Sequence, residues 1–467
     1  MKHLKILGFI LLFFSCVETT KKDTVEASAI ETDLKLAWLP LTLSENYLAK
    51  VSEAIPHYGV SDMVLSHRLG HVLESHLNYP ERVEITQPLL ATWKAKGVSR
   101  IWAWSHELSG LPENQVPASI ENIDWQAIEL FLTNKYQRFF ALLPKVDGIV
   151  LVVNETQVNL MRGFPRDVAQ PNMERLVNLV HGICLKEGKR LALATYCDRA
   201  SELEMIASII ENIPNDIIII NKHVPHDYHA PFPSNPLIAS SQGKEQWISF
   251  DLGLQFELQN TVPVADVERL LSDMKHAYSY GARMFSARLD RYDGEKGQSS
   301  LTTPWGRLSL LTMKEFMNNP DVTVEEIVAQ WEENEGIPNA GKLLANCTQF
   351  VHHLMYPCGQ YGSKHSRMPL VSKLPDIIAG RMRNEPVSGW TGKQKDIDFE
   401  QAMLTGDPKI LSALEKEIAF LDSTLAKINE LEYLVKGNPD WEQGLQRLRT
   451  LYPVFRDYHR FFYHYLV

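Results

Sequence analysis

The sequence predicts a protein of the α/β class, a (β/α)8 TIM barrel followed by an all-helical C-terminal region. Eight short runs rich in Val, Ile, Leu and Trp alternate with helical stretches at intervals of roughly 25–50 residues, which is typical of such a barrel. From Val324 onward the helical periodicity continues without strand-like runs. An open doubly wound sheet shows the same alternation and is the alternative, although no Gly-x-Gly-x-x-Gly motif follows the early strands.

The predicted strands are short and mostly unbroken by polar residues, as expected of strands that are buried on both faces. The clearest is the fourth, Ile149–Val153, where five apolar residues lead directly into Asn154 and Glu155. The eight predicted strands are, in order, Leu36–Pro40, Met63–Leu69, Arg100–Ser105, Ile149–Val153, Leu191–Tyr196, Asp216–Ile220, Gln246–Phe256 and Arg283–Leu289.

Helices are predicted between these strands and after them. The first ends before Pro56, because proline interrupts a helix. The barrel helices are Ser44–Ile55, Arg82–Lys96, Trp125–Leu143, Glu202–Ile213, Val264–Tyr280 and Leu301–Asn318. Those of the C-terminal region are Val324–Glu333, Lys342–Tyr356, Asp407–Val435, Trp441–Leu451 and Tyr452–Leu466. We place a barrel domain at 34–320 and a helical domain at 321–467. The aromatic residues of the last helix favour packing in the core, with a homodimer contact as the alternative.

The N-terminus has the features of a bacterial lipoprotein signal. Lys2 and Lys5 precede an apolar run, Ile6–Phe14, that is too short to span a membrane. The segment LFFSC resembles a lipobox, which makes residues 1–16 a signal peptide with Cys16 as the lipidated residue. Residues 17–33 are polar and are predicted to be a tether. We therefore expect an exported protein in the cell envelope, anchored through lipid, with the outer membrane favoured.

Composition argues against several partners and cofactors. The formal net charge is -10 and no Lys/Arg-rich run is present, so nucleic acid is not expected as a partner. The cysteines after the signal show no Cys-x-x-Cys spacing, so we predict no metal site, redox site or cofactor. Cys347 and Cys358 could form a disulfide in an oxidising envelope, and buried free thiols are equally compatible with the sequence.

Polar residues follow most of the predicted strands. Because the C-terminal ends of barrel strands open on one mouth, where barrel enzymes carry out their chemistry, we expect these side chains to converge. Taken singly, each also has a structural explanation, such as a hydrogen-bonded histidine or an ion pair inside the barrel. The candidate residues are Arg68, His106, Glu107, Asn154, Glu155, Lys222, Asp227, Tyr228, Asp251, Gln255, Glu257 and Arg288.

Carboxylates in an aromatic-walled mouth suit glycoside hydrolysis, in which one acid protonates the leaving oxygen and a second group handles water or the sugar carbon. The aromatic candidates for stacking on sugar rings are Trp38, Trp102, Trp104, Tyr196 and Tyr228, with burial in the core as the alternative for the tryptophans. A metal site is less well supported, because the cluster His223, His226, Asp227 and His229 has no known ligand spacing.

Two segments carry a resemblance to a family. Lys222–Tyr228 (KHVPHDY) and Phe250–Gln259 (FDLGLQFELQ) resemble the Lys-x-Gly-Pro-x-Asp-Phe and Gln-Glu-Tyr-x-Gly-Gln segments of bacterial alpha-glucuronidases. The resemblance implies a (β/α)8 barrel with a helical C-terminal region and an inverting enzyme that removes uronic acid branches from xylan. It implies that Glu155 is the general acid, Asp227 a base carboxylate and Lys222 a lysine that holds the sugar.

This chain departs from the family pattern at three places. Gln255 stands where the second base carboxylate is expected, and an amide cannot take a proton from water. Val224 replaces the motif glycine, and the fifth-strand arginine that binds the uronate has no counterpart in Leu191–Tyr196.

We therefore predict an exported glycoside hydrolase that acts on an acidic oligo- or polysaccharide. Glu155 would be the acid, Asp227 would activate water, and Gln255 would orient that water. The residues predicted to bind the substrate are Lys222, Asn154, Arg68, His106, Glu107, Tyr228, Asp251, Glu257 and Arg288. Arginine is suited to bidentate pairing with a uronate, unless the basic residues serve carboxylates of the barrel. The alternative function is a non-catalytic carbohydrate-binding envelope lipoprotein with a degenerate active site.

Overall fold

The structure is a computed structural model, and it describes residues 34–42, 44–66, 77–117, 119–153, 156, 158–161, 164–197, 199–291, 299–356, 359, 390 and 408–466. By their contacts, Leu34–Val467 form one compact unit. The predicted signal peptide with Cys16, the tether, Arg68, Asn154, Glu155 and Cys358 lie outside the described residues.

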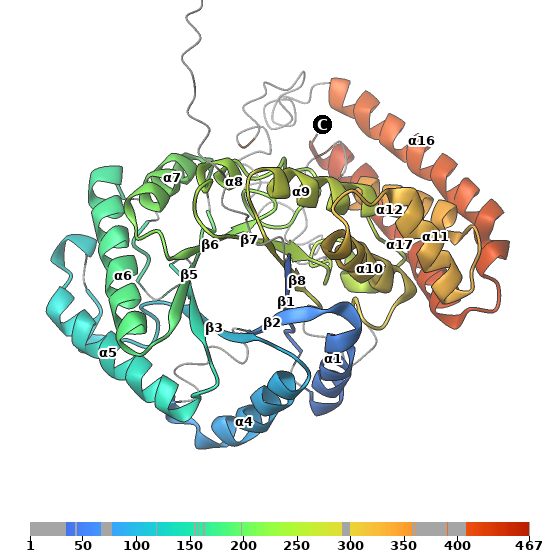
Figure 1. The fold of residues 1–467 in the computed structure, drawn as a ribbon. Coiled ribbons are helices and arrows are strands. Elements are labelled where there is room, and N and C mark those ends of the chain that lie inside the picture. The colour runs from blue at the N-terminus through green and yellow to red at the C-terminus, as the bar shows by residue number, and fades with distance from the viewer. Residues whose placement is uncertain are drawn as a thin grey trace, which may run out of the picture. The chain divides into compact units, whose positions relative to one another are not determined.

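Eight parallel strands close into a barrel in the order of the chain, which confirms the predicted (β/α)8 fold and rules out the open sheet. In Figure 1 the strands form an inner ring, and the helices that connect them lie outside it. The barrel is closed by β1 and β8, where Leu39 is paired with Arg288. The strands are β1 (Lys35–Leu39), β2 (Val60–Leu65), β3 (Arg100–His106), β4 (Gly148–Val152), β5 (Arg190–Ala194), β6 (Ile218–Lys222), β7 (Gln246–Asp251) and β8 (Met284–Arg288).

The strand ends differ from the prediction mainly at β7, which stops at Asp251 instead of Phe256. The carboxylate of Asp251 accepts the backbone N–H groups of Gly253 at 3.1 Å and of Gln255 at 2.7 Å. These two hydrogen bonds turn the chain away from the sheet, as Asp side chains commonly do at turns.

The barrel helices follow the predicted alternation, with two additions, α6 and α8, and one extension. Helix α6 is absent from the sequence prediction, and Pro171 lies inside it. Helix α1 runs through Pro56 to Tyr58 because Ile55 and Tyr58 are buried, and it ends at Gly59 in the left-handed conformation. The helices are α1 (Glu45–Tyr58), α4 (Pro80–Ala95), α5 (Trp125–Leu142), α6 (Arg166–Lys186), α7 (Leu203–Asn212), α8 (Leu237–Ser240), α9 (Val267–Ser279) and α10 (Pro304–Asn318).

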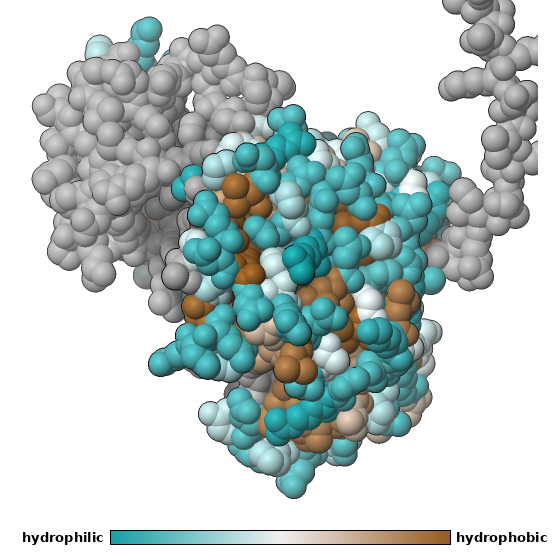
Figure 2. All heavy atoms as spheres, turned by 90° about the vertical axis from the view of Figure 1, so that its left-hand side faces the viewer, coloured by the Kyte–Doolittle hydropathy of each residue, from teal (hydrophilic) through white to brown (hydrophobic). Residues whose placement is uncertain are grey.

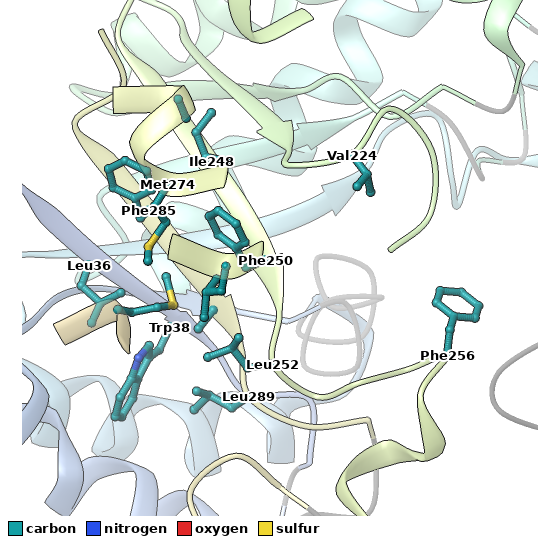
Figure 3. Packing of buried hydrophobic residues seen from close by; sticks show 14 of the residues in the cluster. Leu36, Trp38, Val224, Ile248, Phe250, Leu252, Phe256, Met274, Phe285 and Leu289 are labelled. Carbon is teal, nitrogen blue, oxygen red and sulfur yellow. The ribbon is translucent and has the colours of Figure 1, made fainter. Parts of the chain in front are cut away.

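Two apolar layers lie on the two sides of the sheet. Inward-facing strand residues form the first layer, in which the rings of Trp102 and Trp247 meet edge to face at 5.7 Å. Outward-facing residues form the second with the helices, and Trp38 belongs to it together with Leu252 and Leu289 (Figure 3). Trp38 and Trp102 are therefore core residues, which is the alternative that the sequence left open for them.

The described helices of the helical region are α11 (Val324–Glu335), α12 (Ala340–Met355), α16 (Pro408–Leu431) and α17 (Pro439–Leu466). The last is one continuous helix, where the sequence predicted a break at Tyr452. The region packs against α9 and α10 (Figure 1). Trp441 meets Trp305 of α10 at 5.6 Å, and the hydroxyl of Thr348 accepts the backbone N–H of Ala265 at 3.0 Å. The division into two domains at residue 320 stays a prediction.

Among the residues that the structure describes, few large apolar side chains are exposed. Figure 2 shows the face that includes α5 and α6, where hydrophobic residues appear in separate places among hydrophilic ones. Leu130 on α5 and Leu185 on α6 are among the exposed ones. None of the helices in the described parts of the chain combines the length and the apolar character that crossing a bilayer requires.

Candidate active site

The C-terminal ends of β6, β7 and β8 bring charged side chains together. Lys222 ends β6, Asp251 ends β7 and Arg288 ends β8. The pairing of the strands places Asp251 beside Arg288, and Lys222 beside Ser249. Side chains of a strand alternate between its two faces, so these residues share the inward face with the apolar residues below them. The predicted convergence at this part of the mouth is therefore present in the structure.

The Lys222 ammonium lies in a cage made by one carboxylate and two aromatic rings. Its Nζ donates to Asp227 Oδ1 at 2.7 Å. It also lies 3.9 Å from the ring centroid of Tyr196 and 4.8 Å from that of Tyr228. A cation over the face of a tyrosine ring is attracted by the electrons of the ring. The site therefore holds its lysine in place before any ligand arrives.

Asp227 is ionised in this arrangement. Burial alone would raise its pKa, but the ammonium of Lys222, helped by His226 and His229, outweighs burial and lowers the pKa well below the ordinary value. The side chain of Asp227 nevertheless remains 33% exposed. The carboxylate is therefore charged, and a ligand in the mouth can reach it.

Arg288 holds the second carboxylate of this cluster. It forms a bidentate pair with Asp251, with Nε donating to Oδ1 at 2.8 Å and Nη2 lying 2.6 Å from Oδ2. Burial would lower the pKa of Arg288, but Asp251 raises it above its ordinary value. Nη2 also donates to Oε1 of Gln255 at 2.7 Å. Arg288 thus fixes both the end of β7 and the side chain of Gln255.

Tyr228 connects the two ion pairs. Its ring lies 4.9 Å from the guanidinium of Arg288 as well as beside Lys222. Its hydroxyl is within 2.8 Å of Ser249 Oγ, and burial raises the pKa of Tyr228 to about 12. Tyr228 is therefore a neutral, hydrogen-bonded aromatic wall of the site.

Glu107 lies outside the mouth, which corrects the prediction that it binds substrate. Its carboxylate is fully buried on the outer side of β3. There it accepts the hydroxyl of Tyr136 and pairs with the ammonium of Lys135 at 3.3 Å, both residues of α5. His106, the preceding residue, is half-buried, and its Nε2 accepts the indole N–H of Trp104 at 3.1 Å. Glu107 therefore ties α5 to the barrel.

Glu257 is also buried away from the position predicted for it. Its side chain accepts the hydroxyl of Tyr356, the residue that follows α12. Burial raises the pKa of Glu257 to about 8, so the group is neutral at pH 7. The sequence carries no signal for this contact, because the two residues are 99 positions apart.

Three further predicted residues cannot be placed at this mouth. Arg68, Asn154 and Glu155 lie outside the described residues, and the last described residue before Glu155 is Val153, directly after β4. The role of Glu155 as the general acid therefore stays a prediction.

The histidines of the loop after β6 make contacts of their own. His223 is 2.8 Å from Asp273 of α9, and His226 is 2.9 Å from the carbonyl oxygen of Cys197. The ring of His226 stacks on that of Tyr196 at 5.6 Å. Among the residues that the structure describes, no three His, Cys, Asp or Glu side chains are grouped as metal ligands.

Comparison with known proteins finds similarity in structure but not in sequence. Neither a protein-family model nor a curated protein sequence matches the chain. A GH138 enzyme targeting pectin rhamnogalacturonan II has a similar structure, with a TM-score of 0.60 and 12% identity over 93% of this chain and 71% of that chain. CpGH84B gives a TM-score of 0.47 and 14% identity over 93% and 69%, respectively. An O-GlcNAc hydrolase mutant from Thermobaculum terrenum gives 0.44 and 10% over 93% and 94%. At 12% identity, the similarity to the GH138 enzyme shows that the two proteins share a fold.

Proposed function

We propose that the protein is a glycoside hydrolase with its active site at the C-terminal mouth of the barrel. The observation that carries this proposal is the partly exposed, ionised Asp227, which pairs with Lys222, whose ammonium lies over the rings of Tyr196 and Tyr228. Aromatic walls around a carboxylate suit a sugar ring, whose apolar face stacks while its hydroxyls bond to the charged pair. The GH138 enzyme supports the proposal at the level of fold.

In the proposed reaction Asp227 acts as the base and Glu155 as the acid, with inversion at the sugar carbon. Lys222 now lowers the basicity of Asp227 through the 2.7 Å contact. A sugar hydroxyl that draws the ammonium toward itself would weaken this contact and raise the basicity of the carboxylate. Substrate binding would thus prepare Asp227 to take a proton from water.

Gln255 suits a supporting part in this scheme. Its side-chain oxygen accepts from Arg288 at 2.7 Å, which fixes the orientation of the amide. An amide cannot deprotonate water, but a fixed amide can hold a water molecule in line with the sugar carbon. The same residue favours the second candidate function, a non-catalytic carbohydrate-binding protein, because a carboxylate is expected there in the alpha-glucuronidases.

That the substrate carries an acidic sugar is a separate and more specific part of the proposal. Lys222 and Arg288 are two cations of this cluster, and each already holds a carboxylate of the protein, at 2.7 and 2.6 Å. A uronate would have to compete with Asp227 or Asp251 for them. This pairing favours a neutral glycoside over a glucuronide, so a uronate requirement would have to come from other residues.

The deciding experiment compares product release from oligosaccharides by the natural chain, Glu155→Gln and Asp227→Asn, with Glu325→Gln on the surface of α11 as the control. Loss of a general acid or base lowers turnover about 10²–10⁴-fold. The control should keep the natural rate. Unchanged turnover in Asp227→Asn would remove its role as the base, and binding without product by the natural chain would establish the binding protein instead.

A comparison of kcat/KM on a uronide and on its matching neutral glycoside tests whether the enzyme recognises a uronate. One charge-assisted contact contributes about 1.5–3 kcal/mol, or roughly 10–150-fold in kcat/KM. Equal rates on both substrates would support a neutral sugar as the substrate. A preference for the uronide that disappears in Arg288→Met would instead support an acidic sugar bound by Arg288.

The cellular location is proposed from the sequence alone. Lipid attached at Cys16 would hold the barrel at the envelope surface through the polar tether, where external polysaccharide is available. Cys16→Ser should release the protein from the membrane fraction, and unchanged fractionation would contradict lipid anchoring at this residue.

A further inference from the structure

The loop that follows β7 has an unusual backbone. Leu254, Leu258, Gln259 and Asn260 all have positive φ angles, of 52, 64, 52 and 58°, and the last three are consecutive. The left-handed conformation costs roughly 1–2 kcal/mol for a residue such as Leu or Gln, whereas Asn adopts it more readily. Such a segment persists only where surrounding contacts determine it, and strain of this kind concentrates at functional sites. The loop also contains Gln255, which contacts Arg288.

Contacts within this loop, and contacts from α10 and from the end of α12, hold it in place. Within it, the side chain of Asn260 donates to the carbonyl of Leu252 at 2.9 Å. From α10, the indole N–H of Trp305 donates to the carbonyl of Asn260 at 3.2 Å. From the end of α12, Tyr356 donates to Glu257. The strained conformation therefore depends partly on groups that lie beyond β8 in the chain.

The loop after β6 meets the same carboxyl group. Glu257 interacts with the backbone N–H of Ala230, three residues after Asp227. Next to it, the ring of His229 lies 3.8 Å from that of Phe256 and 5.8 Å from that of Tyr356. In Figure 3, Phe256 lies apart from Phe250 and Leu252, although all three belong to the same buried apolar cluster.

We propose that Glu257 and Tyr356 are positioning residues that hold the loops after β6 and β7 in register, so that the helical region completes the active site. Glu257 is two residues from Gln255, and Ala230 is three residues from Asp227. A fixed Glu257 therefore limits the movement of both groups that would handle the water molecule. The inference rests on the proposed function for its catalytic meaning, but the restraint on the loops can be measured without a substrate.

The link also depends on pH. Burial raises the pKa of Glu257 to about 8, with the negative charge of Asp251 acting in the same direction. Above this pH the ionised carboxylate would have to be hydrated, and the loop would open to admit water. The titratable groups that face it are Tyr356 of the helical region, His229 of the loop after β6, Asp251 of β7 and Asp266 before α9.

The test compares Tyr356→Phe with Tyr452→Phe in the full chain. Each variant loses one hydroxyl that donates to an acidic side chain, and Tyr452 donates to Asp422 at 2.6 Å inside the helical region. Hydrogen exchange of residues 225–230 and 252–261 is followed by mass spectrometry. We expect at least tenfold faster exchange of both segments in Tyr356→Phe and natural exchange in Tyr452→Phe. Natural exchange in Tyr356→Phe, or equal acceleration in both variants, overturns the proposal.

Glu257→Gln supplies the conservative replacement, because a neutral amide oxygen still accepts the Tyr356 hydroxyl. We expect protected loops in this variant and, if the chain is a hydrolase, turnover that persists above about pH 8, where the natural chain loses kcat. In Tyr356→Phe, kcat should fall about tenfold with little change in KM, since the loops carry the water-handling groups. If no substrate is turned over, the exchange measurements still decide the positioning role. An exchange rate in Glu257→Gln as high as in Glu257→Ala would contradict it.

Discussion

Replacing Glu257 by glutamine should stabilise the protein at neutral and alkaline pH but not at acid pH. In the folded chain the pKa of this buried carboxyl rises from 4.5 to about 8, so at pH 7 the folded state keeps a proton that the unfolded state releases. The stability that the protonated group contributes is complete below the pKa of the carboxyl in the unfolded chain. It is lost as the pH rises through the pKa in the folded chain. Keeping a carboxyl of ordinary pKa protonated at pH 7 costs on the order of 3 kcal/mol. Glutamine avoids this cost because it needs no proton.

Urea denaturation of the full chain at about pH 4, 7 and 9 measures the effect through the free energy of unfolding. The gain in Glu257→Gln should be near zero at pH 4, should reach up to about 3 kcal/mol at pH 7, and should be largest at pH 9. Asp422→Asn is the control, because Asp422 accepts a similar tyrosine hydroxyl but is exposed. A variant that is less stable than the natural chain at both pH 7 and pH 9 would refute the reasoning that Glu257 is buried in its neutral form.

Three further outcomes follow from buried contacts. Lys135→Met should lower the free energy of unfolding by about 3–5 kcal/mol, because it leaves the Glu107 carboxylate buried without its cation; a loss below about 1 kcal/mol in urea denaturation would contradict this. Gly253→Ala should destabilise the chain by at least about 1 kcal/mol, since the added Cβ would lie 2.7 Å from the backbone carbonyl of Asp290; an unchanged melting temperature would count against that contact. Cys347 should resist a thiol reagent until the protein unfolds, since it is fully buried and burial raises the pKa of its thiol; labelling of Cys347 in the folded protein, followed by mass spectrometry, would show otherwise.

Hydrophobic patterning was sufficient to predict the barrel because its strands are buried on both faces. Runs such as Ile149–Val153 have no polar alternation, and the structure places their strands within a few residues of the prediction. The errors arose where side chains act over longer distances than periodicity can report. The end of β7 is set by the carboxylate of Asp251 capping two backbone N–H groups, and α1 passes through Pro56 because Tyr58 beyond it is buried.

For three charged residues of the candidate site the sequence predicted that they would meet, but it did not predict how they pair. Lys222, Asp251 and Arg288 end neighbouring strands, so their convergence follows from the fold. The position of Glu107 could have been predicted from the alternation of side chains along β3. Trp104 and His106 face inward, so Glu107 points outward to the helices. The pairing of each cation with its carboxylate depends on how loops return to the barrel, which no local pattern encodes.

The consecutive left-handed residues after β7 have a consequence for how this protein would respond to selection. Glycine adopts positive φ at little cost, so glycine at the partly exposed Gln259 would relieve local strain, whereas glycine at Leu258 would also remove a buried side chain. Glycine at Gln259 would also free the loop to leave the conformation that brings Gln255 to Arg288. Natural proteins commonly exchange stability for activity at such places. A library selected for thermal tolerance alone should therefore collect glycine at Gln259, and such variants should unfold at a higher temperature than the natural chain while losing turnover.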